Sequence, residues 1–84
     1  MRFTVSWDEA AEQSLAELFL DAGDRFEIRA AADWIDENLQ TQPDRIGHYV
    51  HEGLLGLQRS PLKVLYSLSL EDRLVEVLGV ARSR

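Results

Sequence analysis

Two apolar stretches separated by a charged tripeptide decide the fold: Leu62-Lys-Val-Leu-Tyr-Ser-Leu-Ser-Leu70, then Glu71-Asp-Arg73, then Leu74-Val-Glu-Val-Leu-Gly-Val-Ala81. Both stretches are rich in residues found in β-strands, and a short polar turn between such stretches is typical of a β-hairpin. In the first stretch, Val64 and Tyr66 share one face of a strand, while Lys63 lies on the other. A hairpin is not stable alone. We therefore expect it at the centre of an antiparallel sheet, with helices on one face and a functional surface or a partner protein on the other.

Two amphipathic segments precede the hairpin. The first begins with Ser6 and Glu9 at the spacing of a capping box, and Gly23 is the expected stop. The second begins at Asp24, an expected N-cap, and ends before Pro43. Apolar residues recur at intervals of three or four along both segments, which predicts an antiparallel helical hairpin. The two stripes are Ala11, Leu15, Leu18 and Ala22, and Ile28, Ala31, Ala32, Ile35 and Leu39.

Two further strands are expected outside the hairpin. Residues 2–6 alternate polar and apolar side chains, which favours a short strand at an edge of the sheet. Residues 54–57 form an apolar strand with a central glycine, whereas residues 45–53 show no strong period and are interpreted as a polar connector. The sequence thus predicts a single α+β domain over residues 1–84 with the order βααβββ. Its sheet is expected to be antiparallel, with three or four strands and the helical hairpin on one face.

Composition limits the possible functions. The 84 residues include no cysteine, which excludes disulfides and thiolate metal sites, and the net charge of −6 argues against an obvious nucleic-acid binder. The expected helices carry the acids, whereas residues 41–84 are close to neutral, so an anionic partner would bind the sheet. The sequence shows neither the apolar core of a signal peptide nor a membrane span, which predicts a cytoplasmic protein without a membrane partner.

The order of the expected elements and the residue pattern of the expected strands resemble those of the RelE/ParE superfamily of toxins from toxin–antitoxin modules. The resemblance covers nearly the whole chain. It is carried by Pro61-Leu-Lys-Val-Leu-Tyr66, the turn Glu71-Asp72-Arg73, Leu74-Val-Glu-Val-Leu-Gly-Val80, Phe3-Thr-Val-Ser-Trp-Asp-Glu-Ala10 and Ala31-Ala-Asp-Trp-Ile35.

The resemblance implies the toxin of a type II module of the plasmid stabilisation type, bound and neutralised by a cognate antitoxin. ParE-like members inhibit DNA gyrase, whereas RelE-like members cut messenger RNA on the ribosome with a cluster of basic residues. Three functions follow: growth inhibition through a macromolecular target such as gyrase, ribosome-dependent endoribonuclease activity, and a toxin-fold binding module without catalysis. Whether the chain is an enzyme stays open; we expect no cofactor and allow for a homodimer.

Matching residue by residue, Lys63 falls where RelE-like nucleases often carry a strand arginine, and Arg82 and Arg84 fall near their basic C-terminal segment. Other positions depart from the nuclease pattern. Residues 54–57 are uncharged, Gly79 stands where similar sequences often have arginine, and the chain stops before any terminal catalytic tyrosine. Because cleavage of RNA depends on cations that stabilise charge developing on phosphate, these departures favour a binding function over a nuclease.

Candidate site residues fall into two overlapping sets. The catalytic candidates are Lys63 and Arg82 for phosphate charge and His51 or Glu52 for proton transfer. The target-binding candidates are Arg59, Lys63, Arg73, Arg82 and Arg84. His48, His51 and Glu52 resemble a metal cluster, but their segment follows Pro43 and Gly47 and is not expected to be helical, so exposed loop histidines without a metal are the preferred interpretation. Trp7 and Trp34 are expected to pack in the core rather than to stack on bases.

Overall fold

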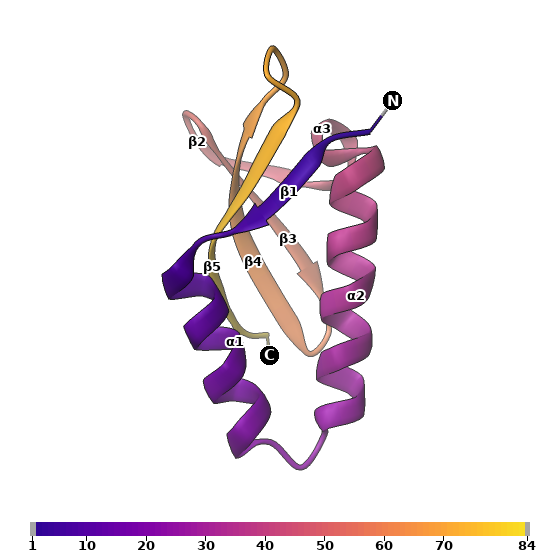
Figure 1. The fold of residues 1–84 in the computed structure, drawn as a ribbon, viewed down its shortest axis with the longest axis vertical. Helices are drawn as coiled ribbons and strands as arrows, with labels where there is room; N and C mark the ends of the chain where they lie inside the picture. The colour runs from indigo at the N-terminus through magenta and orange to yellow at the C-terminus, as the bar shows by residue number, and fades with distance from the viewer. Residues whose placement is uncertain (1, 84) are drawn as a thin grey trace.

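The computed structural model describes residues 2–83 and forms a five-stranded sheet with the strand order β1-β5-β4-β3-β2, accompanied by three helices (Figure 1). This is the α+β class expected from the sequence. The elements, in chain order, are β1 (Thr4–Trp7), α1 (Glu9–Asp21), α2 (Arg25–Thr41), α3 (Pro43–Ile46), β2 (His48–His51), β3 (Leu54–Arg59), β4 (Leu62–Ser69) and β5 (Leu74–Arg82).

The expected hairpin is confirmed as the antiparallel pair β4 and β5, whose register runs from Leu62 opposite Arg82 to Ser69 opposite Leu74. The pairing is irregular at one point, because Leu65 lies opposite Gly79 and Tyr66 lies opposite Val77, which leaves Leu78 as an extra residue in β5. Such a β-bulge exchanges the faces on which the following side chains lie. As a result Val80, like Val77, packs with the core.

The sheet differs from the expected one in two respects. It has five strands rather than three or four, because residues 48–51, interpreted as connector, pair with β3 as the edge strand β2. It is also mixed rather than antiparallel, since β1 pairs in parallel with β5, with Val5 opposite Val75. β5 has one neighbour within the hairpin, so its other edge is free to accept β1.

The helical hairpin is confirmed: α1 and α2 run in opposite directions and are joined by a short turn (Figure 1). The start of α1 lies two residues later than expected, because Asp8 rather than Ser6 is the N-cap; its Oδ2 accepts a hydrogen bond from the backbone N–H of Ala10 at 3.3 Å. Asp24 is at the expected N-cap position of α2 but its side chain makes no cap hydrogen bond. Within residues 2–83 no helix is long and apolar enough to cross a membrane.

The core lies between the helices and one face of the sheet. α2 contributes the buried stripe expected from its spacing, namely Ile28, Ala31, Ile35 and Leu39. α1 packs on β5, and α2 packs on β1, β3 and β4. The sheet contributes Leu57, Leu62, Val64, Tyr66, Val75 and Val77.

Tyr66 connects this core to the short helix α3. Its ring is fully buried, and its hydroxyl donates a hydrogen bond to the carbonyl oxygen of Pro43 at 2.6 Å. Burial, and secondly the charge of Asp44, raises the pKa of the Tyr66 hydroxyl to about 12. The hydroxyl therefore stays protonated and remains a hydrogen-bond donor to α3.

Candidate functional site

The sheet face turned away from the helices, here called the open face, has no element of the described chain packed on it. Side chains alternate between the two faces of a strand. Val64 and Tyr66 of β4 enter the core, so Lys63 and Leu65 lie on the open face, as do their partners Gln58 and Gly56 on β3. The side chains available on this face are therefore set by the same alternation that builds the core.

A groove of about 450 Å³ crosses the open face from β2 to β5. Most of its lining is apolar or glycine. Three polar side chains, those of His48, Gln58 and Lys63, supply its hydrogen-bonding and charged groups. The full lining is His48, Val50, Gly56, Leu57, Gln58, Lys63, Val64, Leu65, Gly79, Val80 and Ala81.

Gly56 determines where the His48 ring lies. The two residues are opposite each other in the β2–β3 ladder, and a Cβ atom at position 56 would come within 2.8 Å of His48 Nε2 and 2.9 Å of its Cε1. The imidazole can therefore approach the backbone of β3 only because residue 56 has no side chain. His48 was expected in an exposed loop; in the structure it lies in a strand and lines the groove beside Gln58 and Lys63.

His51 and Glu52, the two candidates for proton transfer, lie at the far end of β2. Nδ1 of His51 is 3.2 Å from the carbonyl oxygen of Glu52, and both side chains are exposed. Neither lines the groove that contains Lys63. His51 and Glu52 are therefore separated from Lys63, although all three were predicted to belong to one catalytic site. Among residues 2–83, no group of three or more histidine, cysteine, aspartate or glutamate side chains is arranged to hold a metal ion.

The expected cationic surface is divided between the two faces. Arg59 lies opposite Leu62 on the helix side, and its guanidinium stacks 4.5 Å from the centre of the Trp34 ring. Arg73 is in the turn between β4 and β5 with a φ of 54°. Of the four candidates within residues 2–83, Lys63 alone lines the groove. Arg84 lies outside the described residues.

Arg82 is paired with Asp24, at the turn between α1 and α2. Its guanidinium donates two hydrogen bonds to the carboxylate, at 2.9 and 3.1 Å, in a bidentate arrangement. The hydrogen bond from Arg82 lowers the pKa of Asp24, and the same contact raises the pKa of Arg82. Arg82 lies opposite Leu62 in the β4–β5 ladder, and Leu62 is buried in the core, so both side chains lie on the helix side of the sheet. Lys63 follows Leu62 in β4, so its side chain lies on the open face. The structure does not bring these two catalytic candidates together.

Gln58 and Gly56 were not among the site residues predicted from the sequence. A usable signal exists, since a glycine within an apolar strand often marks the close approach of another group. The alternation of His48 and Val50 around Tyr49 is a second signal for a strand, although three residues are too few to distinguish it from a loop.

Solved structures share this fold along almost the whole chain. The toxin–antitoxin complex RelBE2 from Mycobacterium tuberculosis contains a chain that matches with a TM-score of 0.80 and 21% identity, over 98% of this chain and 99% of that one. A chain of the RelE–RelB complex from Pyrococcus horikoshii matches with a TM-score of 0.70 and 17% identity, over 98% and 96%. A chain of the ParDE system from Pseudomonas aeruginosa gives 0.64 and 15%, over 99% and 98%.

The fold expected from the sequence, that of the RelE/ParE superfamily, is confirmed by these structures. No protein-family model and no curated protein matches the sequence. At identities of this size the likeness establishes the architecture, and the activity has to be argued from the open face itself.

Proposed function

We propose that this chain, which has the fold of RelE and ParE, is the toxin of a type II toxin–antitoxin pair and acts by binding a protein target. A cognate antitoxin neutralises it by covering the surface that the target would otherwise occupy. The binding surface is the open face, and the target we favour is DNA gyrase, which ParE-like toxins inhibit. The observation that carries this proposal is the composition of the groove on that face.

The groove supports binding better than cleavage of RNA. Within residues 2–83, Lys63 is the one lysine or arginine that lines the groove, while Arg59 stacks on Trp34 and Arg82 pairs with Asp24. Stabilising the charge that develops on a phosphate during cleavage requires positioned cations. A largely apolar groove with one lysine, one histidine and one amide instead has the composition of a protein-binding surface, in which a few polar groups set the orientation.

Two measurements test the proposal. Inducing the chain alone should arrest growth, and DNA replication should stop before translation. The purified protein should block supercoiling by gyrase, and Lys63→Ala should weaken this inhibition by about fivefold or more, as for a contact at the centre of an interface. Arg59→Ala is the matched control, because it removes a cation from the other face and should leave inhibition unchanged. Folded protein that leaves supercoiling intact would exclude gyrase.

The antitoxin is tested separately. A protein that binds only the folded chain raises its stability by mass action, by about 2.7 kcal/mol when present at one hundred times its dissociation constant. We expect the product of an adjacent small reading frame to raise the melting temperature accordingly and to restore growth. An unchanged melting temperature with saturating partner would rule that product out as the antitoxin.

Ribosome-dependent cleavage of messenger RNA is the second candidate, because His48 and Lys63 line the same groove. In that function Lys63 would stabilise phosphate charge, and His48 would serve as acid or base. Gly56→Ala offers a direct test, since the added Cβ displaces the His48 ring without removing it. If the chain is a nuclease, Gly56→Ala and Lys63→Ala should each lower cleavage at least tenfold, whereas His51→Ala should not. Equal cleavage by all three variants would remove the groove from the mechanism.

A further inference from the structure

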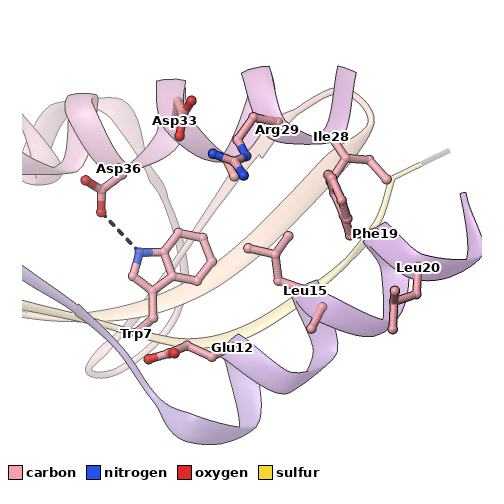
Figure 2. Close-up of a pocket in the computed structure, with 11 residues that line it drawn as sticks. Trp7, Glu12, Leu15, Phe19, Leu20, Ile28, Arg29, Asp33 and Asp36 are labelled. Carbon is pink, nitrogen blue, oxygen red and sulfur yellow. Dashed lines mark hydrogen bonds between the residues drawn. The ribbon is translucent and has the colours of Figure 1, made fainter. Parts of the chain in front are cut away.

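A second groove lies in the helical layer, between α1 and α2, with a volume of about 570 Å³. Figure 2 shows its two walls, with Leu15, Phe19 and Leu20 on α1 and Ile28, Arg29 and Asp33 on α2. Trp7 closes one end, and its indole N–H donates a hydrogen bond to Oδ1 of Asp36 at 3.1 Å (Figure 2). That bond joins β1 to α2 and fixes the ring as part of the groove.

The shape of this groove suits a helix. Its lining extends from Glu12 to Leu20 on α1 and from Ile28 to Asp36 on α2, which corresponds to walls about 12 Å long at a rise of 1.5 Å per residue. Near the middle, Ala16 and Ala32 face the groove with the smallest available side chain, so another backbone can approach closely. Two turns of an added helix would match the length of the walls and place apolar side chains between them.

Apolar surface is left uncovered here. Leu20 lines the groove and keeps 70% of its surface exposed, while Leu15 and Phe19 are half-buried. Covering such side chains removes apolar area from water, which contributes roughly 25 cal/mol for each Å². A partner with leucine-like side chains would gain this contribution along the whole groove.

The charges around the groove select the partner. Its rim holds three carboxylates, those of Glu12, Asp33 and Asp36, against one cation, Arg29. The adjoining helix α1 contains four acidic residues and no basic one. A helix with lysine or arginine along both edges of its apolar face is therefore complementary, and one with acidic edges is not.

We propose that the groove between α1 and α2 is a docking site for an amphipathic helix of a partner protein, apolar on one face and basic along its flanks. This interface goes beyond the proposed function, because it lies in the helical layer rather than on the open face. A second copy of the chain is a poor occupant, since α1 of that copy would bring further carboxylates to an acidic rim.

The probe is a synthetic 18-residue peptide of leucine and lysine in a helical pattern, compared with the same peptide carrying glutamate in place of lysine. Binding is measured by calorimetry at low and at physiological salt, and the contacted amides are mapped by NMR. The lysine peptide should bind, with chemical-shift changes in α1, α2 and Trp7. The glutamate peptide should bind at least tenfold more weakly.

Paired variants separate docking from nonspecific attraction between a cationic peptide and an acidic protein. Leu20→Ser should weaken binding about fivefold. Phe26→Ser should not, because Phe26, although even more exposed at 82%, does not line the groove. Asp33→Asn should weaken binding more than Asp21→Asn, which removes the same charge outside the groove. Arg29→Ala removes a positive charge that repels the lysine peptide, so it should strengthen binding.

Three outcomes would overturn the proposal: no binding of the lysine peptide to folded protein, shifts confined to the open face, or equal effects of the paired variants. None of these outcomes bears on growth arrest or on gyrase, so the failure of this inference and the failure of the proposed function can be told apart.

Discussion

The two faces of strand β4 meet different surroundings. On the helix side, Val64 and Tyr66 are buried, and Tyr66 holds α3 through its hydroxyl. On the open side, Lys63 is exposed and Leu65 is only half-buried beside a groove. One face is thus committed to stability, and the other is left free for the contact proposed above. Substitutions that affect the two faces should therefore have different effects, which three pairs of variants can check. A fourth experiment compares one variant on the helix side with the parent.

The largest difference is expected between Tyr66 and Leu65. Tyr66→Ala removes a fully buried aromatic ring and should cost about 3 to 5 kcal/mol, a large share of the stability of a domain this small. Leu65→Ala should cost only about 1 kcal/mol, because the side chain already contacts solvent. Urea unfolding of the two variants measures both values, and equal losses would contradict the assignment of the faces.

Two glycines give the next comparison. A Cβ at Gly47 would collide with the hydroxyl and ring of Tyr66, so Gly47→Ala should cost about 1 to 3 kcal/mol. At Gly79, on the open face, nothing lies within 4 Å of an added Cβ, and the backbone angles suit any residue. Gly79→Ala should therefore be neutral or stabilise by up to about 1 kcal/mol, through the entropy of the unfolded chain. Thermal unfolding distinguishes them, and a destabilised Gly79→Ala would mean that the open face is covered.

Two cations separate stability from function. Arg59→Ala removes the stacking of a guanidinium on Trp34 and should lower the free energy of unfolding by about 0.5 to 1 kcal/mol, with target inhibition unchanged. Lys63→Ala should leave stability within about 0.5 kcal/mol of the parent and reduce inhibition. Chemical denaturation and the supercoiling assay, applied to both proteins, measure the contrast. Loss of inhibition in Arg59→Ala and loss of stability in Lys63→Ala would mean that the roles assigned to the two faces are wrong.

The smallest effect is expected at Asp24, whose carboxylate and its partner Arg82 are both partly exposed. The pKa of Asp24 in the folded chain lies below its ordinary value of 3.8, so the pair contributes to stability above that pH. The contribution should disappear as the pH falls through the lowered pKa, when the folded carboxylate takes up a proton. Asp24→Asn should lack this component. Unfolding curves for parent and variant should therefore converge below pH 3.8 and separate slightly above it.

Much of the architecture could be predicted from the sequence because its signals are local. The apolar spacing of α2 places Ile28, Ala31, Ile35 and Leu39 in the core, as observed, and the turn between β4 and β5 joins strands that pair directly. The parallel pairing of β1 with β5 is not a local property. It depends on which sheet edge remains free after the hairpin has formed, and the residues of β1 do not indicate which strand they will pair with.

The candidate site was harder to predict for a related reason. The bulge at Leu78 changes which side chains of β5 share a face. Strict alternation would place Val80 on the same face as Leu74, whereas in the structure it lies on the face of Val77. His48 was assigned to a loop because four residues give too short a pattern for a strand. Arg82 could not be separated from Lys63, because its partner Asp24 is distant in the sequence.

The parallel pairing of β1 with β5 also determines when the sheet can form during synthesis. β1 is near the start of the chain and β5 near its end, and within residues 2–83 β5 is the one strand that pairs with β1. During synthesis β1 therefore waits, without a partner strand, until β5 has left the ribosome. A ribosome that stalls before Leu74 releases a product in which β1 has no neighbour and α1 has no β5 to pack on. Under the toxin function proposed above, incomplete copies of this kind would be harmless.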